Sequence, residues 1–497
     1  MKATIGIDVG TSAVKVAAVG LDGSLLAEAS RPYPTHTPRP GWVEQSPEDW
    51  WTAACAALHA LRAAAPDVDY VGIGLSGQLN GVVLLDEADE CLGDSIIWLD
   101  TRATEEADAL AVSYGALMRE RAATELNAIT VLAKLSWLAR NDAERLGLAR
   151  SALLVKDYIL WKLTGARQTD PSDASATGMM DIHSLEWIDE LCQAAGFDPG
   201  LLPPIGRSTV IAGHVTQQAA ALTGLPAGLP VVPGGGDVAA LAVGCGVAEP
   251  GVLGVTLGTA GHVVLAREAS EPFRTRPGLW RVTHADPAQA LWLGLVMSGG
   301  LSLSWLHRLL QSAGSPLTFA AMVEMCEGVP PGANGVTFVP FLEGAATPYA
   351  APAARGAFNG LSSSSSAGDM VQAVMEGVAY NVRQCVELFA ELGGTIAEVR
   401  IAEGGARVDR WCQILADVLQ RPVIRLEYLD TSSLGAALMA QTAVTGVELR
   451  ALTADLAKGG QRFEPDPRER VAYENGYRRY LVGAEGEIAR TLHLRNH

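Results

Sequence analysis

The chain has 497 residues, of which 48% are hydrophobic and 19% charged, and its formal net charge at pH 7 is −18. This length is too great for one hydrophobic core, so two or three domains are expected. The negative charge argues against a nucleic-acid-binding or anionic-membrane surface, because both need basic patches. A nucleotide substrate stays open, since backbone amides and Mg²⁺ can hold one.

The cysteine pattern and the first residues bear on cellular location. Seven cysteines are scattered without a Cys-x-x-Cys pair, which favours buried thiols in a reducing compartment. The chain enters its first predicted strand without a signal-peptide pattern. No apolar run approaches the ~20 residues that span a bilayer. We therefore expect a cytoplasmic protein.

The first predicted element is a pair of strands around a Gly-Thr-Ser turn. The strand at 4–9 carries Asp8 near its end, and Gly10, Thr11 and Ser12 form the turn. Glycine lets a phosphate approach the main chain, whose N–H groups can bind it. Asp8 could hold Mg²⁺ directly or through water, because hard cations take oxygen ligands. The alternative is an ordinary hairpin, since these residues are common in turns.

Polar residues follow other predicted strands of the first half. A loop carrying Trp42 leads into a helix with Ser46 as its N-cap and Asp49 as the capping-box acid. Gln78 and Asn80 follow a strand at the point where a sheet delivers side chains into a crevice. The alternative is that these two side chains only satisfy a turn.

The next predicted strand, 96–102, also ends in charged residues. Asp100 and Arg102 could form a structural ion pair or line a sugar site, and the sequence leaves both readings open. Residues 103–200 are predicted to be mostly helical, with an amphipathic piece at 156–165. The polar, turn-rich loop 169–175 could also face a ligand.

A strand at 230–233 runs into three glycines, Asp237 and a helix of small residues. The glycines leave space for another molecule beside the acid. A carboxylate there could accept a proton from a substrate hydroxyl, and the helix N-terminus would favour its ionised form. The alternative is that Asp237 is only a helix N-cap.

A second copy of the first hairpin lies about half the chain further on. The segment 253–260 repeats the first hairpin position for position, with Gly258 and Thr259 in its turn. Two related hairpins predict two domains of one plan with a cleft between them. Thr256 stands where the first copy has Asp8, so a metal site belongs to the first half only, whereas both turns could bind phosphates. The predicted domains are 1–247 and 248–497.

Late in the chain, the strand at 399–402 runs into Gly404 and Gly405, which open a helix. Such a turn suits close approach by a flat or anionic ligand, although the motif alone is weak.

Taken together, these stretches resemble the FGGY carbohydrate kinase family over essentially the whole chain, and most of all its xylulokinases. The stretches that carry the resemblance are 5–15, 42–45 with the Trp50-Trp51 helix, 77–78, 234–237, 257–259, 355–361 with 369–376, and 404–407. The resemblance implies an α/β fold of two ribonuclease-H-like (actin-like ATPase) domains that close on ATP, Mg²⁺ and a sugar.

The resemblance also implies roles for residues. Asp237 would be the catalytic base, and Asp8 would lie near Mg²⁺. The nucleotide site would comprise Gly10, Thr11, Ser12, Lys15, Gly258, Thr259, Gly300, Gly404 and Gly405. The sugar site would comprise Trp42, Gln78, Leu79, Asn80, Asp100 and Asp237.

The implied reaction is phosphoryl transfer from ATP to a ketopentose, with D-xylulose as the leading candidate. Another ketose or a polyol is the first alternative, and a non-catalytic ATP-binding sugar sensor is a distant one, because a sensor does not need Asp237. The expected partners are the sugar and ATP, without nucleic acid or membrane, and a homodimer is left open.

Four residues, at three places in the chain, depart from the xylulokinase pattern. Leu79-Asn80 replaces Met-His, and Val238 replaces the Asn that usually follows the base. Both lie at expected sugar contacts, so they bear on which sugar is used. Glu403 replaces the first of three glycines near the adenine.

Overall fold

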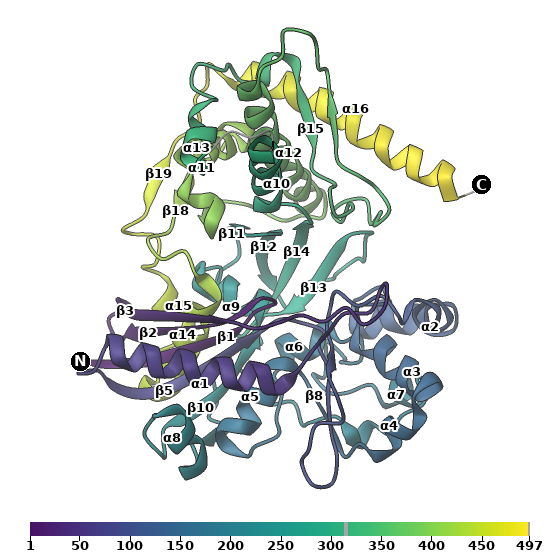
Figure 1. Cartoon of the computed structure of the whole chain (residues 1–497), viewed down its shortest axis with the longest axis vertical. Helices are drawn as coiled ribbons and strands as arrows, with labels where there is room; N and C mark the ends of the chain where they lie inside the picture. Colours follow the sequence, from purple (N-terminus) through teal and green to yellow (C-terminus); the bar gives the residue numbers. More distant parts are fainter. Residues whose placement is uncertain (313–316, 496–497) are drawn as a thin grey trace.

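The computed structural model describes residues 1–312 and 317–495 of the chain. Its two lobes, one above the other in Figure 1, are each built on a mixed β-sheet with helices packed against it. Of the helices in these residues, none has the length and apolar character needed to cross a membrane.

The lower lobe contains a six-stranded sheet in the order β3-β2-β1-β5-β10-β9. Its strands are β1 (Lys2–Val9), β2 (Ala13–Gly20), β3 (Leu25–Pro32), β5 (Asp69–Gly77), β9 (Gly213–His214) and β10 (Pro230–Gly236). β1, β2 and β3 form an antiparallel meander, whereas β1, β5 and β10 are parallel. The carboxyl ends of these three parallel strands therefore meet at one edge of the sheet.

The upper lobe contains a seven-stranded sheet in the order β13-β14-β12-β11-β17-β18-β19. Its strands are β11 (Val252–Leu257), β12 (Gly261–Glu268), β13 (Leu279–Thr283), β14 (Gln289–Val296), β17 (Glu398–Ala402), β18 (Val423–Arg425) and β19 (Gln461–Phe463). β14, β12 and β11 are antiparallel, and β11, β17 and β18 are parallel. The order β14-β12-β11-β17-β18 thus repeats β3-β2-β1-β5-β10, which confirms the predicted two units of one plan.

Short strand pairs and helices complete both lobes. The short strands are β4 (Glu44–Gln45), β6 (Val83–Leu85), β7 (Ser95–Ile96), β8 (Ser151–Leu153), β15 (Thr337–Val339) and β16 (Ala357–Asn359). The helices of the first half are α1 (Pro47–Ala64), α2 (Thr104–Leu117), η1 (Met118–Ala122), α3 (Val131–Asn141), α4 (Ala143–Leu148), α5 (Val155–Thr164), α6 (Pro171–Ala176), α7 (Asp189–Ala194), η2 (Pro199–Leu201), α8 (Gln217–Thr223) and α9 (Asp237–Gly244). Those of the second half are α10 (Gly300–Ser312), α11 (Phe319–Glu324), η3 (Ala333–Gly335), α12 (Ala367–Glu391), η4 (Gly404–Arg407), α13 (Asp409–Leu419), α14 (Thr431–Thr445), α15 (Leu449–Thr453) and α16 (Arg470–Arg495).

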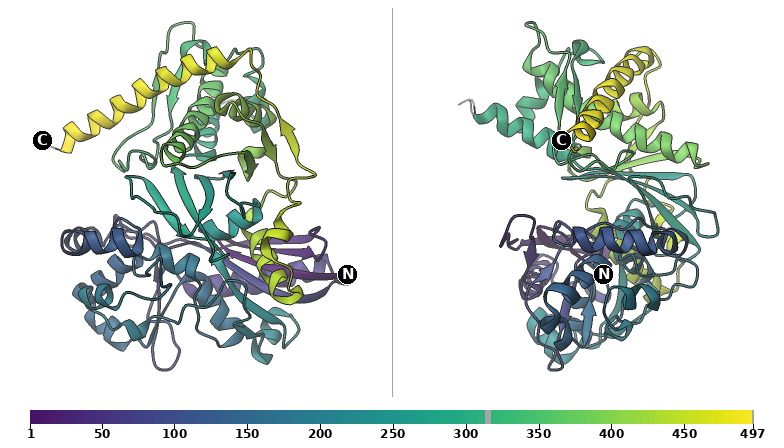
Figure 2. Two further views of the ribbon diagram at one scale, coloured as in Figure 1. Left: turned by 180° about the vertical axis from the view of Figure 1, so that it is seen from behind. Right: turned by 90° about the vertical axis from the view of Figure 1, so that its right-hand side faces the viewer.

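Two helices, α9 and α14, connect the lobes by packing against each other and against both sheets. α9 packs against β12 and β13 of the upper sheet, and α14, from the second half of the chain, packs against β1, β5 and β10 of the lower sheet. Seen from behind in Figure 2, the yellow-green α14 and α15 lie against the lower lobe. Glycines allow the close approach, because a Cβ on Gly6 or Gly74 would overlap a carbonyl oxygen of α14. The division at 247/248 stays a prediction, and this packing crosses it.

Several local expectations differ from the structure. The N-cap of α1 is Ser46, but its side chain makes no capping hydrogen bond. The expected strand over 96–102 is limited to β7, which ends at Ile96. The expected amphipathic helix near 156–165 is α5, whose residues 155–160 are all buried. Tertiary contacts decide each of these features, and local patterns do not report them.

Candidate active site

The first candidate residue, Asp8, lies near the end of β1, directly opposite Lys15 on β2 and Ser76 on β5. The Ser76 hydroxyl donates a 2.7 Å hydrogen bond to Asp8 Oδ1. Burial, and next the charge of Asp430, raises the pKa of Asp8 to about 6, against the opposing effects of Lys15 and Ser76. Asp8 is therefore a positioned carboxylate whose charge a nearby cation would stabilise.

The turn after Asp8 is held from outside by aromatic and amide side chains. The Trp98 indole N–H donates to Thr11 Oγ1 at 2.9 Å, and Gln45 Nε2 donates to the Thr11 carbonyl at 2.8 Å. The Tyr33 hydroxyl donates to the Gly10 carbonyl. These contacts use side-chain and carbonyl groups and fix the path of the Gly-Thr-Ser turn before any ligand binds.

Lys15 connects this turn to the second half of the chain. Its ammonium lies 2.8 Å from Asp430 Oδ2, at the N-cap of α14. Although burial opposes it, the charges of Asp430, Glu403 and Asp8 raise the pKa of Lys15, so it stays protonated. Three carboxylates around one ammonium give this region a negative balance. An anionic nucleotide would therefore need a cation with it, and the oxygen donors fit Mg²⁺.

The second turn lies beside the start of α10. The Gly300 N–H donates to the Gly258 carbonyl at 2.7 Å, and the Leu301 N–H donates to the Thr259 carbonyl at 3.1 Å. A Cβ on Gly405 would overlap the Leu257 side chain, so η4 packs directly against the end of β11. The structure thus brings together Gly258, Thr259, Gly300, Gly404 and Gly405, which the family resemblance implied for one nucleotide site.

Glu403 precedes η4 with φ +70° and ψ −171°, a backbone conformation that is essentially restricted to glycine. Its carboxylate faces the second turn, because a Cβ on Gly258 would lie 3.4 Å from Glu403 Oε2. Burial raises the pKa of Glu403 to about 7, while Lys15 lowers it. The departure at this position therefore places both strain and a carboxylate beside a predicted phosphate turn.

We expect Glu403→Gly to stabilise the protein by about 1 kcal/mol, because relief of 1–3 kcal/mol of backbone strain outweighs the 0.5–1 kcal/mol entropy cost of glycine. Chemical denaturation followed by circular dichroism measures this change. Glu403→Gln is the matched control, since it removes the charge and keeps the strain. An equal gain in both variants would show that charge, and not backbone strain, destabilises this position.

Asp237 is the first residue of α9, directly after the glycines that end β10. The N-cap is Gly236, so the alternative in which Asp237 is only the N-cap is wrong. Asp237 Oδ1 accepts a 2.7 Å hydrogen bond from the Val238 N–H. Burial, and next the charge of Asp8, raises the pKa of Asp237 to about 7. A carboxylate with a pKa near neutrality matches what a general base at this pH requires.

Asp8 and Asp237 lie at the same edge of the lower sheet. Asp8 pairs with Ser76 on β5, and Gly235 of β10 pairs with the same Ser76. Two strand spacings separate β1 from β10, which puts their backbones roughly 10 Å apart. The two carboxylates are close enough for the charge of Asp8 to raise the pKa of Asp237.

The segment Gln78-Leu79-Asn80 follows β5 at the same edge. Gln78 Nε2 donates to Gln45 Oε1 at 2.8 Å, and Asn80 has a left-handed φ of +61°. Lys134, fully buried, donates from Nζ to the Asn80 carbonyl at 2.5 Å, and burial lowers the pKa of Lys134 to about 7. Within the described residues, Gln78 Oε1 and Asn80 Oδ1 are buried acceptors without a donor. Hydroxyl groups of a ligand are the kind of donor that would satisfy them.

Leu79 and Val238 belong to the apolar packing between α9 and the upper sheet. Val238 is buried in a cluster with Val264 and Val282, and Leu79 packs against that cluster. At these two departures from the xylulokinase pattern, the hydrophobic side chains therefore belong to one apolar cluster, which includes β12 and β13 of the upper lobe.

Asp100 and Arg102 form an ion pair in the structure. Arg102 donates to Asp100 from its backbone N–H, Nε and Nη2 at 2.6–3.0 Å, and its guanidinium stacks 3.7 Å from the centroid of Trp42. The Val43 N–H donates to the same carboxylate at 2.6 Å. With these donors, the geometry favours the structural reading of Asp100, and Trp42 packs on this ion pair.

Sequence reasoning missed the buried side chains behind the site. Lys134 and Lys156 are both 0% exposed, although each appeared as one of many charged residues in a helical region. The only signal was the polar loop 169–175, which contains the N-cap Asp170 and most of the short helix α6. Ser172 of this helix accepts a 3.0 Å hydrogen bond from the Gly236 N–H, next to Asp237.

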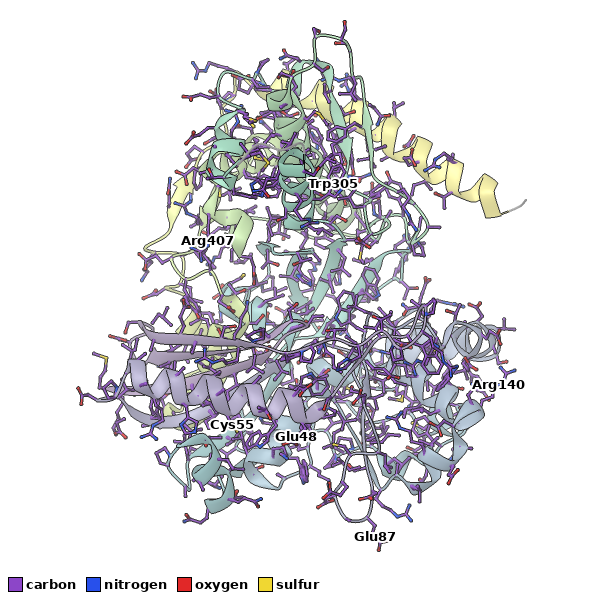
Figure 3. The ribbon with its side chains drawn as sticks, viewed as in Figure 1. Glu48, Cys55, Glu87, Arg140, Trp305 and Arg407 are labelled. Carbon is purple, nitrogen blue, oxygen red and sulfur yellow. The ribbon has the colours of Figure 1, made fainter. Side chains whose placement is uncertain are left out.

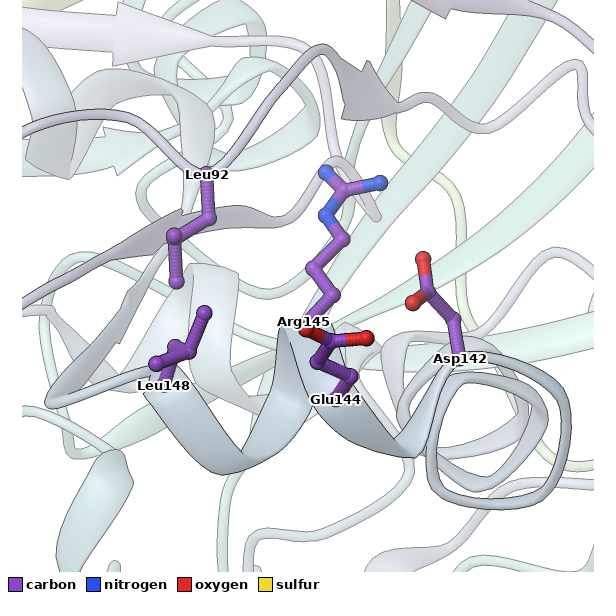
Figure 4. A pocket seen from close by; sticks show the side chains of 5 residues that line it. All are labelled: Leu92, Asp142, Glu144, Arg145 and Leu148. Carbon is purple, nitrogen blue, oxygen red and sulfur yellow. The ribbon is translucent and has the colours of Figure 1, made fainter.

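Two cavities lie apart from these residues. One, of about 220 Å³, is lined by Leu92, Asp142, Glu144, Arg145 and Leu148 on the lower lobe, as Figure 4 shows. The other, of about 470 Å³, lies beside η4 and is lined by Arg407, Arg425, Leu426, Glu427, Leu429, Gly459 and Gln461. Arg407, which lines this second cavity, is labelled in the upper lobe in Figure 3. Neither cavity contains Asp8 or Asp237.

Comparison with known proteins identifies relatives over most of the chain. A model of the FGGY family of carbohydrate kinases, N-terminal domain, matches residues 3–244, and the model of its C-terminal domain matches residues 253–444. Xylulose kinase of Bacillus subtilis (strain 168) is 33% identical over 444 residues, which cover 88% of both chains. Glycerol kinase of Citrifermentans bemidjiense is 30% identical over 485 residues, covering 94% of both. The crystal structure of xylulose kinase from Rhodospirillum rubrum superposes with a TM-score of 0.88, at 31% identity, over 98% of this chain and 99% of that one.

Proposed function

This chain belongs to the FGGY family of carbohydrate kinases, and we propose that it transfers the γ-phosphate of ATP to a hydroxyl of a ketopentose, with D-xylulose as the first candidate. The family and the two-domain actin-like ATPase fold expected from the sequence are confirmed. The observation that carries the proposal is the placement of Asp237 and Asp8 at one sheet edge. The Gly10 turn directly follows β1, which carries Asp8, and Glu403, which interacts with Lys15 and Asp8, lies beside the Gly258 turn.

In the proposed site, the nucleotide phosphates bind the N–H groups of the two turns, and Lys15 provides the nearby positive charge. Asp8 would hold Mg²⁺ directly or through water, and the bound ion would supply neutralisation of the charge that develops on the phosphates. Gly300, Gly404 and Gly405 would border the adenine. Asp237 would take the proton from the sugar hydroxyl that attacks phosphorus. Contact between the lobes would exclude water, which competes as an acceptor.

The sugar would bind beside Asp237, near Gln78 and Asn80. Their unpaired acceptors, Gln78 Oε1 and Asn80 Oδ1, favour a polyhydroxylated ligand over an apolar one. Most of the relatives named above act, by their names, on xylulose, and one acts on glycerol. D-Xylulose is therefore the first candidate, and another ketose or a polyol is the second.

A panel of sugars tests this function. Purified protein is incubated with ATP, Mg²⁺ and, in turn, D-xylulose, D-ribulose, L-ribulose, xylitol or glycerol, and ADP release is measured. We expect the highest kcat/KM with D-xylulose. A higher kcat/KM with another ketose or polyol would identify that compound as the preferred substrate, and the proposed kinase activity would still stand. Nucleotide binding without turnover of any of them would favour a sensor.

The role of the Asn80 amide can be tested with Asn80→Gly. Glycine adopts the left-handed φ of +61° without strain, so the variant removes the side chain and keeps the turn. We expect KM for the sugar to rise about tenfold, equivalent to one lost hydrogen bond of about 1.4 kcal/mol, with KM for ATP unchanged.

Gln420→Gly is the matched control for this change, because Gln420 has a φ of +52° at the C-cap of α13 in the upper lobe. It should leave both KM values unchanged. An Asn80→Gly enzyme with wild-type KM for every sugar would show that the Asn80 amide makes no sugar contact.

A further inference from the structure

Behind the proposed base, a sealed cluster contains one ammonium and three carboxylates. Lys156 Nζ lies 2.6 Å from Asp157 Oδ1, 2.9 Å from Asp170 Oδ1 and 3.6 Å from Asp173 Oδ2. The four side chains are at most 1% exposed. Solvent therefore does not screen these four charges, and the protonation state of each side chain depends on the other three.

Full ionisation would leave a net charge of −2 in this buried space. An uncompensated buried charge is strongly unfavourable, and a carboxyl group in such a place retains its proton instead. Three like charges on neighbouring carboxylates add to this cost. At least one of the three aspartates should therefore be neutral.

The hydrogen bonds show which aspartates are stabilised as anions. Asp170 Oδ2 accepts from the Ser172 N–H at 2.8 Å, the Ser172 hydroxyl at 2.5 Å and the Ser208 hydroxyl at 2.9 Å. Asp157 has the shortest contact with Lys156. Within the described residues, neither oxygen of Asp173 has a hydrogen-bond partner, and its ammonium contact is the longest. Asp173 is thus the carboxyl group with the least support for a negative charge.

Asp173 also lies next to the glycines that precede Asp237. The Gly236 N–H donates to Ser172 Oγ at 3.0 Å, and a Cβ on Gly236 would lie 3.5 Å from Asp173 Cα. The charged groups that face Asp173 are Lys156, Asp157, Asp170 and Asp237. A negative charge on Asp173 would therefore act directly against the ionisation of Asp237.

We propose that Asp173 is a neutral carboxylic acid in the folded protein at neutral pH, and that its neutrality lets Asp237 ionise. Asp173 is then a positioning residue, since it acts on the reaction through Asp237. The protonation of Asp173 stands by itself, whereas its effect on Asp237 rests on the proposed function. Burial raises the pKa of Asp173 well above its usual range, in agreement with the geometry.

Infrared spectroscopy tests the protonation without any substrate. Protein labelled with carbon-13 in the aspartate side-chain carboxyl is measured at pH 8, where Asp8 and Asp237 are mostly ionised. We expect a carbonyl band of a protonated carboxylic acid that Asp173→Asn removes and Asp170→Asn, if it folds, retains. Absence of this band from the wild-type protein would overturn the proposal, even if neither variant folds.

Stability and the pH profile of kcat/KM provide the second arm. Asparagine imitates a neutral aspartic acid, so Asp173→Asn should melt close to wild type, whereas Asp170→Asn should melt clearly lower. The acid limb of the Asp173→Asn profile should stay where it is in wild type. A limb shifted to lower pH would mean that a negative charge had been removed, and the proposal would be wrong. If no sugar is phosphorylated, the proposed function fails, and the infrared result still decides the state of Asp173.

Discussion

Asp237→Asn is expected to lower kcat for sugar-dependent ATP turnover by about 10²–10⁴-fold, the usual range for loss of a general base. Asparagine has the size of aspartate and keeps an oxygen for the Val238 N–H, but it cannot take a proton from the sugar. Binding of sugar and of MgADP should remain, as measured by calorimetry. Retention of more than about a tenth of the wild-type rate would show that Asp237 is not the base.

The same variant has a predictable effect on stability. The folded protein raises the pKa of Asp237 from 3.8 to about 7, through burial and then Asp8. A raised folded-state pKa contributes stability that is present below the unfolded value and is lost as pH rises through the folded value. Asparagine cannot ionise, so above pH 7 the variant should melt at or above the wild-type temperature. Because Asp237 must be ionised to accept a proton, wild-type kcat/KM should fall as pH drops below about 7.

Asp189→Asn is the matched control for both readouts. Asp189 is also the first residue of a helix, α7, but it is exposed and lies in another part of the lower lobe. Its replacement should change neither kcat nor the pH dependence of melting. An equal loss of activity in the two variants would point to a general effect on helix starts.

Local sequence patterns were sufficient for the two glycine turns and for the strands around them. Alternating apolar residues on both sides of Gly10 and Gly258 specify antiparallel pairs, and the structure has β1–β2 and β11–β12 at these places. The strand into Gly236 and the helix from Asp237 follow equally from local signals, because glycines end the strand and small residues continue as a helix. What these features share is that neighbours in sequence determine them.

Features that depend on distant residues could not be read in this way. α14 lies on the lower sheet because Gly6 and Gly74, more than 300 residues away, leave room for its backbone. The burial of Lys156 depends on Asp170, the N-cap of the next helix, and on Asp173 within it, whereas a lysine beside an aspartate usually indicates a solvated helix surface. The role of Asp100 was undecided because the donors that occupy its carboxylate, Arg102 and the distant Val43 N–H, are known only from the folded structure.

The family comparison and the geometry contribute different parts of the functional argument. The matched models and relatives identify a carbohydrate kinase. They do not assign individual residues, which rest on the contacts around Asp8, Asp237 and Asn80. Variants at these positions therefore test the site, whereas the sugar panel tests the substrate.

Asp8→Asn is expected to remove most of the contribution of Mg²⁺ to nucleotide binding. The Asn side chain can still accept the Ser76 hydroxyl, so the end of β1 should keep its structure. Without the carboxylate, the affinity for the metal should fall by about 10–100-fold, as is typical when a metal-supporting group is lost. ADP binding in EDTA should be unchanged or tighter, because one of the three carboxylates around Lys15 has lost its charge.

The informative quantity is the ratio of the Kd for ADP in EDTA to the Kd in Mg²⁺, measured by calorimetry on wild type and variant. We expect a large ratio for wild type and a ratio near one for Asp8→Asn. Asp69→Asn is the control, since Asp69 is exposed at the opposite end of β5 and should keep the wild-type ratio. An unchanged ratio in Asp8→Asn, or loss of its cooperative melting, would show that the proposed role of Asp8 in holding the metal is wrong. Because burial and Asp430 already raise the pKa of Asp8, the folded variant should be at least as stable as wild type above pH 6.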